Sequence, residues 1–154
     1  MKKMIILGIE TSCDETSASI VKEGKNGQCE ILSNIVHSQI SEHTDYGGVV
    51  PEIAARSHIQ NIDKVVEKSI TESGINLKDL DAIAVTSGPG LKGGLIVGVT
   101  FAKAMASVLK IPILGINHLE GHALTIRMVE NILFPYLLLL VTGGHTQLLI
   151  VKNV

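Results

Sequence analysis

The stretch Met4-Ile5-Ile6-Leu7-Gly8-Ile9-Glu10 decides the fold, because it is apolar almost throughout and therefore predicts a buried β-strand. A polar turn follows at residues 11–15, and residues 16–22 alternate between polar and apolar side chains like a second strand. After a further turn at residues 24–27, residues 29–36 supply a third strand. The chain is therefore expected to open with consecutive strands joined by turns.

Helical periodicity begins at Pro51, which suits a first helical position and stands beside the acidic Glu52. Gly74 is expected to end this helix. The apolar stripe that faces the core is predicted to consist of Ala54, His58, Ile62, Val65, Val66 and Ile70.

Strands and helices then alternate, with a fourth strand over residues 81–86 and a fifth over residues 113–116. The helix between them, over residues 94–109, is apolar on most sides and is expected to be buried. Its small residues recur every four positions and predict close packing against another backbone: Gly94, Gly98, Ala102 and Ala106. The order βββαβα predicts an α/β fold, a mixed sheet with helices on its faces.

The segment His118-Leu119-Glu120-Gly121-His122 follows the fifth strand, and Asn117 is a candidate N-cap. Histidines four residues apart on a helix project from one face, so both imidazoles can bind one zinc or iron ion. The pattern differs from the metalloprotease helix motif, in which glutamate directly follows the first histidine. On the residues alone, a solvated or capping role for the pair remains an alternative.

Composition sets the broad class of the protein. The 154 residues are 45% hydrophobic and 18% charged, as in globular domains. A net charge of −2 gives no indication of a basic surface for binding nucleic acid. Two cysteines are too few for a disulfide scaffold. Residues 131–151 lack charged side chains over a membrane-like length, but their polar centre favours two strands around a turn. These features predict a soluble, cytoplasmic protein.

Residues 136–152 repeat the opening pattern of the chain, with an apolar strand, a Thr-containing turn and a returning strand. This repetition suggests an internal duplication. A terminal hairpin without a covering helix would leave apolar surface and a strand edge exposed. We therefore expect residues 1–130 to form a first lobe and residues 131–154 to be the opening hairpin of a truncated second lobe.

Five segments together resemble the bacterial tRNA N6-adenosine threonylcarbamoyltransferase family of TsaD-type proteins, formerly described as O-sialoglycoprotein endopeptidases. They are Gly8-Ile9-Glu10-Thr11-Ser12-Cys13-Asp14-Glu15-Thr16, Tyr46-Gly47-Gly48-Val49-Val50-Pro51-Glu52, Ser87-Gly88-Pro89-Gly90-Leu91, Asn117-His118-Leu119-Glu120-Gly121-His122 and Thr142-Gly143-Gly144-His145-Thr146-Gln147. The resemblance implies a lobe of the actin/Hsp70/sugar-kinase-like (ASKHA) fold, with two duplicated lobes around a nucleotide cleft.

The resemblance also implies a reaction. A threonylcarbamoyl group moves from threonylcarbamoyl-AMP, an adenine nucleotide, to N6 of the adenosine beside the anticodon in tRNAs that read codons beginning with A. His118 and His122 are implied to be ligands of one Fe2+ or Zn2+ ion. The implied substrate-binding residues are Val141, Thr142, Gly143, Gly144 and His145. Most relatives have Ser where Thr142 stands, which keeps the hydroxyl.

Implied partners are tRNA, an inactive paralogue (TsaB-type) and a small P-loop ATPase (TsaE-type), with a possible homodimer and no membrane. A further metal-ligating Asp and the adenosine-binding residues belong to the second lobe of the family. The 154-residue chain alone is therefore expected to be inactive. A non-catalytic remnant or dimerisation scaffold is the alternative function, whereas a peptidase is disfavoured because no glutamate is placed as the base.

Glu10 and Asp14 are the candidate catalytic residues, because the turn that carries them faces the cleft in this class of fold. Asp14 is expected to accept the proton of the attacking amine, or alternatively to cap the turn. Gly143 and Gly144 could present backbone N–H groups to an anion, or form an ordinary hairpin turn.

The remaining candidates have structural interpretations. Cys13 has no adjacent histidine and is assigned a structural role, and residues 87–91 form either a phosphate-facing loop or a tight strand-to-helix connection. His58 is expected to be a satisfied core or interface histidine, whereas His37 and His43 are expected to be solvated.

Overall fold

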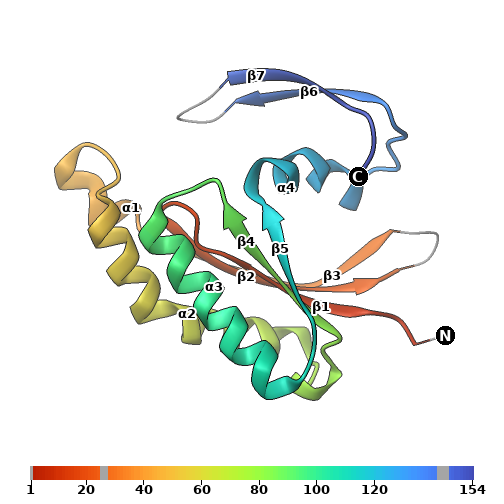
Figure 1. Cartoon of the computed structure of the whole chain (residues 1–154), viewed down its shortest axis with the longest axis horizontal. Helices are drawn as coiled ribbons and strands as arrows, with labels where there is room; N and C mark the ends of the chain where they lie inside the picture. Colours follow the sequence, from red (N-terminus) through yellow and green to blue (C-terminus); the bar gives the residue numbers. More distant parts are fainter. Residues whose placement is uncertain (1, 25–27, 142–145) are drawn as a thin grey trace.

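The computed structural model describes residues 2–24, 28–141 and 146–154. Its elements follow the predicted order closely (Figure 1). The strands are β1 (Ile5–Glu10), β2 (Glu15–Glu23), β3 (Cys29–Ser38), β4 (Ala82–Gly88), β5 (Ile113–Asn117), β6 (Tyr136–Val141) and β7 (Thr146–Val151). The α-helices are α1 (Ile40–His43), α2 (Pro51–Ser73), α3 (Lys92–Leu109) and α4 (His118–Thr125). Short 3-10 helices span Thr44–Tyr46, Leu77–Asp79 and Ile126–Met128.

A five-stranded sheet in the order β3-β2-β1-β4-β5 organises the molecule. Strand β1 runs antiparallel to β2 and parallel to β4, so the sheet is mixed as predicted. Because β1 and β4 are parallel neighbours, Glu10 and Thr86 reach the same edge of the sheet at the carboxyl ends of their strands. This edge is where the site described below is built.

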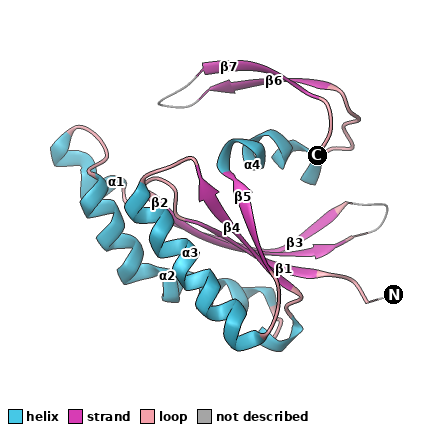
Figure 2. Ribbon diagram, viewed as in Figure 1, coloured by secondary structure: helices cyan, strands magenta, loops and turns pink. Residues whose placement is uncertain are grey.

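Helices α2 and α3 lie side by side on one face of the sheet (Figures 1 and 2). The core between them and the sheet is aliphatic, and it includes Leu7, Ile9, Ile20, Ile62, Val66, Ile83 and Val85. The predicted stripe of α2 is confirmed, with Ile70 half-buried against this core and the other members buried. Pro51 and Gly74 bound the helix as expected, and Gly74 has a φ of 70° that suits glycine.

Helix α3 departs from the expectation that it is buried on most sides. Its fully buried residues are the small-residue ridge Gly94, Gly98, Ala102 and Ala106, while Ile96 and Val108 are 65% and 81% exposed. By length and composition alone, α3 is the one described helix that could cross a membrane, a test that core helices of soluble proteins also pass. Helix α3 therefore carries apolar side chains on its exposed face as well as on the face that packs against the sheet.

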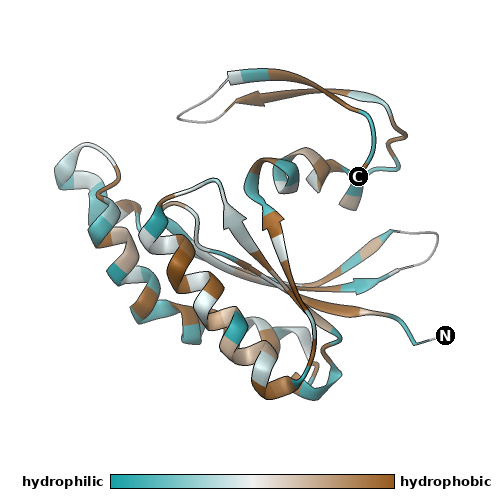
Figure 3. Ribbon diagram, in the orientation of Figure 1, coloured by the Kyte–Doolittle hydropathy of each residue, from teal (hydrophilic) through white to brown (hydrophobic). Residues whose placement is uncertain are grey.

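Helix α4 and the β6–β7 hairpin lie on the other side of the sheet from α2 and α3 (Figure 1). The two strands pair antiparallel, which confirms the hairpin expected within residues 136–152, and Figure 3 shows it as largely hydrophobic. Tyr136 ties it to α4 by donating its hydroxyl to the carbonyl oxygen of Ala123 at 2.5 Å. Alternate residues such as Leu137 and Leu139 are 65% and 64% exposed.

The small residues of α3 should be sensitive to enlargement. A Cβ at Gly98 would lie 2.2 Å from Oγ1 of Thr11, whose hydroxyl is already held by the carbonyl of Gly94 at 2.9 Å. We expect Gly98→Ala to lower the free energy of unfolding by about 1–3 kcal/mol through overpacking, even though alanine favours helices. Urea denaturation followed by circular dichroism measures this change.

Gly121→Ala in α4 is the matched control, because the nearest atom to its Cβ would be Cγ2 of Ile116 at 4.0 Å. This substitution should raise the free energy of unfolding by about 0.5–1 kcal/mol. Equal effects of the two substitutions would contradict the proposed close packing of α3 on Thr11.

Candidate functional site

Helix α4 begins where β5 ends, and its first turn is capped as the sequence predicts. The side-chain oxygen of Asn117 accepts hydrogen bonds from the N–H groups of Leu119 and Glu120 at 2.9 and 3.2 Å. This cap fixes the direction in which the helix leaves the sheet. His118 is thereby placed half-buried over the end of β1, with His122 one turn further out and exposed.

The two imidazoles meet through their Nε2 atoms, which lie 3.1 Å apart. With metal–nitrogen bonds of about 2.0–2.1 Å, this separation corresponds to a nitrogen–metal–nitrogen angle of roughly 100°. That angle lies between the octahedral and tetrahedral values. The pair therefore fits two ligands of one Zn2+ or Fe2+ ion.

Glu10 holds the first of these rings. Its Oε2 accepts hydrogen bonds from Thr86 Oγ1 at 2.6 Å and from His118 Nδ1 at 3.0 Å, and its Oε1 accepts from the N–H of Ser12. A proton on Nδ1 leaves the Nε2 lone pair of His118 free toward His122. A carboxylate behind a histidine is the usual means of orienting a metal ligand.

The pKa of Glu10 lies below its ordinary value. Burial alone would raise the pKa, but hydrogen bonds from Ser12, Thr86 and His118 favour the ionised carboxylate and outweigh burial. The group is therefore an ion at neutral pH. Its negative charge would favour a cation bound on the far side of the His118 ring.

Ser12 and Thr86 belong to the site but were not assigned a role from the sequence. Ser12 Oγ lies 3.1 Å from His118 Nδ1, and the Ser12 carbonyl accepts a hydrogen bond from the Leu91 N–H at 2.7 Å. Their sequence positions gave a signal, since Ser12 follows the carboxyl end of β1 and Thr86 lies near that of the neighbouring β4, where side chains converge. The Leu91 bond also ties residues 87–91 to the turn, as a strand-to-helix connection requires.

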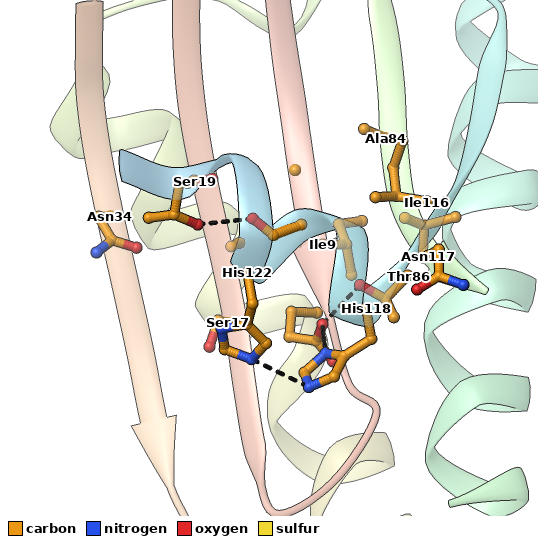
Figure 4. Close-up of a pocket in the computed structure, with 16 residues that line it drawn as sticks. Ile9, Ser17, Ser19, Asn34, Ala84, Thr86, Ile116, Asn117, His118 and His122 are labelled. Atoms are coloured by element: carbon orange, nitrogen blue, oxygen red, sulfur yellow. Dashed lines mark hydrogen bonds and ion pairs between the residues drawn. The ribbon is translucent and has the colours of Figure 1, made fainter. Parts of the chain in front are cut away.

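A pocket of about 340 Å³ extends from the histidines along the open face of the sheet. Its floor carries small polar side chains from β2 and β3, Ser17, Ser19 and Asn34, and α4 forms its roof (Figure 4). Hydroxyl and amide groups of this kind suit a small polar ligand. The pocket thus joins the candidate metal ligands to a surface that carries both polar and apolar side chains.

Within the described part of the chain, the structure does not bring the other predicted site residues to the histidine pair. Asp14 is half-buried in the turn between β1 and β2 and does not line the pocket. Val141 is exposed at the end of β6, and Thr142, Gly143, Gly144 and His145 lie outside the described residues. Within residues 2–24, 28–141 and 146–154, no cluster of three or more His, Cys, Asp or Glu side chains could hold a metal. The described residues therefore offer the histidine pair as two candidate ligands, without a complete set.

Of two histidines outside the site, one has the predicted environment and the other does not. His58 is completely buried and fully hydrogen-bonded, which confirms its interpretation as a satisfied core histidine. His43 is also buried, with 5% exposure, so the expectation that it is solvated is wrong. Its Nε2 bonds to Gln39 Oε1 at 3.3 Å, and Gln39 in turn contacts His58 of α2, a tertiary contact that the local sequence pattern does not reveal.

Comparison with known proteins identifies the family. The family described as tRNA N6-adenosine threonylcarbamoyltransferase (TsaD) matches residues 30–153. The chain belongs to this family. Relatives named tRNA N6-adenosine threonylcarbamoyltransferase from Brucella canis and Rhizobium meliloti are each 56% identical over 151 residues, which is 98% of this chain. The chain spans 42% of the length of these relatives.

Solved structures support the fold class. A Pseudomonas aeruginosa protein with similarity to peptidase YeaZ has a TM-score of 0.60 at 19% identity, covering 95% of this chain and 63% of its own. The Ppx/GppA enzyme of Aquifex aeolicus has a TM-score of 0.55 at 15% identity, covering 97% of this chain and 49% of its own. At these identities the likeness shows the fold alone, and it confirms the predicted ASKHA-type α/β architecture.

The thiol of Cys13 should be unreactive, in line with its structural assignment. Cys13 is an exposed residue, but local desolvation of its thiol, followed by hydrogen bonding and repulsion from Asp14, raises its pKa from 9.0 to about 11. In a Cys29→Ala variant, iodoacetamide should therefore label Cys13 at pH 8 roughly 100-fold more slowly in the folded chain than in urea, because the thiolate fraction falls by that factor.

Labelling of a Cys13→Ala variant, which retains Cys29, serves as the control for reagent access in the folded chain. Similar rates for folded and unfolded Cys13 would show a normal thiolate and would reopen a nucleophilic role for this residue.

Proposed function

We propose that this chain is the N-terminal part of an enzyme that forms threonylcarbamoyladenosine in tRNA. The reaction transfers the threonylcarbamoyl group from threonylcarbamoyl-AMP to N6 of the adenosine beside the anticodon in tRNAs reading codons that begin with A. Membership of the family over residues 30–153 supports the reaction class. The observation that carries the proposal is the His118–His122 pair at 3.1 Å, oriented from behind by Glu10.

His118 and His122 are the residues that would hold the metal, Fe2+ or Zn2+. When bound, a divalent ion at this position supplies Lewis acidity, which polarises a carbonyl and orients anionic oxygens of a substrate. Two neutral imidazoles leave coordination positions free for substrate oxygens and for a ligand from the remaining part of the protein. Glu10 keeps His118 in the tautomer that such binding requires.

The chain's own polar groups position the reactants. Val141, Thr142, Gly143, Gly144 and His145 are proposed to line the acyl-donor site. As the amine nitrogen forms its bond to the carbamoyl carbon, the bond to the phosphate oxygen breaks and AMP leaves. Asp14 is proposed to accept the amine proton at this step, with the adenosine approaching from the side of the turn.

The proposed assembly extends beyond these residues. A second lobe that begins at residue 131 would complete the nucleotide cleft, and tRNA, a TsaB-type paralogue and a TsaE-type ATPase are the proposed partners. A homodimer through the same lobe is also proposed. The reaction requires access to tRNA and free nucleotides, which places the enzyme in the cytoplasm.

Transfer activity tests the proposal in a chimera that joins this chain to the remaining part of the Brucella canis relative, of which it covers 42%. With both partners, tRNA, ATP and threonylcarbamoyl-AMP present, we expect modified nucleoside by mass spectrometry of digested tRNA. His118→Ala or His122→Ala should lower the rate by roughly 100-fold or more, because each removes a ligand. His37→Ala is the matched control, because this histidine does not line the pocket.

The same assay with the 154-residue chain in place of the chimera is expected to give no modified tRNA. An active His118→Ala,His122→Ala double variant of the chimera would contradict the role of the pair. An inactive chimera that folds and binds its partners would contradict the proposed function itself.

A further inference from the structure

A chain of buried polar side chains connects residues 39–50 to the turn that carries the site. Gln39, His43 and His58 have exposures of 0%, 5% and 0%. His58 Nε2 lies 3.1 Å from the Cys13 carbonyl oxygen, and its Nδ1 lies 3.3 Å from Gln39 Nε2. Gln39 Oε1 lies 3.3 Å from His43 Nε2, and His43 Nδ1 is 3.3 Å from the Val50 nitrogen.

Backbone groups at the two ends assign every hydrogen between them. The Val50 N–H can only donate, so Nδ1 of a neutral His43 is an acceptor and its Nε2 carries the proton. That proton is donated to Gln39 Oε1, which turns the amide N–H toward His58. The Cys13 carbonyl can only accept, so His58 carries its proton on Nε2.

Starting from the Val50 N–H or from the Cys13 carbonyl gives the same position for the ring proton of His58. Its Nδ1 must be an acceptor, as the Gln39 amide N–H requires, and the hydroxyl of Thr16, which lies 2.7 Å away, can then donate to it. Burial lowers the pKa of His58, which favours the same neutral form. The network is thus fully satisfied in one arrangement, and such buried networks specify a unique geometry.

The network ends on the turn that builds the site. Gln39 also donates its backbone N–H to the Asp14 carbonyl at 3.0 Å, so it restrains the turn at Asp14 directly and at Cys13 through His58. Cys13 adjoins Ser12, whose N–H is donated to Glu10 and whose hydroxyl lies 3.1 Å from His118 Nδ1. A shift of the Cys13 carbonyl therefore moves groups that orient His118.

We propose that His58 and Gln39 are positioning residues for the candidate site: they fix the carbonyls of Cys13 and Asp14 and thereby hold Ser12 and Glu10 against His118. Neither side chain touches the pocket, so both act through the turn. The inference rests on the proposed function for the meaning of the site. Its test uses nuclear magnetic resonance of the chain itself and needs neither tRNA nor transfer, so the two proposals can fail separately.

The first measurement uses the unchanged, 15N-labelled chain. Ring nitrogen–proton correlations at neutral pH should show both His43 and His58 as neutral rings with the proton on Nε2. A charged His58, or a proton on its Nδ1, would overturn the assigned hydrogen-bond chain. This measurement does not depend on any variant folding.

The second measurement removes the hydrogen bonds and follows the site. His58→Phe keeps a flat ring but no donor or acceptor, so the His118 ring signals should shift and exchange of the Ser12 amide should accelerate at least about tenfold. His58→Gln should rescue both readouts in large part, because its amide N–H can still reach the Cys13 carbonyl. Gln39→Met repeats the test without changing either histidine.

Ser69→Ala is the matched control, because it removes a buried hydrogen bond of α2, Ser33 Oγ to Ser69 Oγ at 2.8 Å, far from the turn. It should leave the His118 signals and Ser12 exchange unchanged. Unchanged His118 signals in a folded His58→Phe or Gln39→Met chain would overturn the positioning role. Equal changes in Ser69→Ala would also overturn it, since they would reflect a general loss of stability.

Discussion

Three successive carbonyl groups in the turn after β1 are held by donors from three different parts of the chain. Leu91 N–H binds the Ser12 carbonyl, His58 Nε2 binds that of Cys13, and Gln39 N–H binds that of Asp14. Buried backbone groups must be paired, because each unpaired group costs about 1–3 kcal/mol. The turn therefore cannot move without releasing α2, the start of α3 or the end of β3. The restrained turn also restrains Glu10 and Ser12, and through their contacts the ring of His118.

The apolar packing of the lobe makes this arrangement possible. Because Gly94 and Gly98 have no side chains, α3 approaches Thr11 so closely that a Cβ at either position would lie 2.2 Å from one of its oxygen atoms. The same closeness lets the Thr11 hydroxyl bind the Gly94 carbonyl inside the core. At this end of the sheet, the small residues of α3 allow a close backbone approach and a buried hydrogen bond where larger side chains would otherwise pack. At the other end, aliphatic side chains such as Ile83 and Val66 fill the core in the usual way.

The fold could be predicted from sequence because each element leaves its own periodicity or cap, as the Pro51 start and Gly74 end of α2 show. The histidine pair could also be predicted, since its spacing lies within one helix. The partners of these histidines could not, because Glu10 and Ser12 lie 108 and 106 residues from His118. The burial of His43 was missed for a related reason. A short polar segment predicts exposure, and the sequence does not show that its neighbour Gln39 packs against His58 of α2. The apolar stripe placed His58 in the core but could not reveal what it binds.

The hydrogen bonds of Glu10 indicate whether it orients His118 or accepts a proton from a substrate. A carboxylate has about four acceptor positions, and three of those of Glu10 are taken by Ser12, Thr86 and His118. Its pKa lies below the ordinary value, because these hydrogen bonds outweigh burial, so the group is a weak base. A carboxylate so occupied is better suited to fixing the tautomer of His118 than to removing a proton from a substrate. In the proposed reaction, the proton of the adenosine amine would then pass to another group, either Asp14 or a residue from the remaining part of the enzyme.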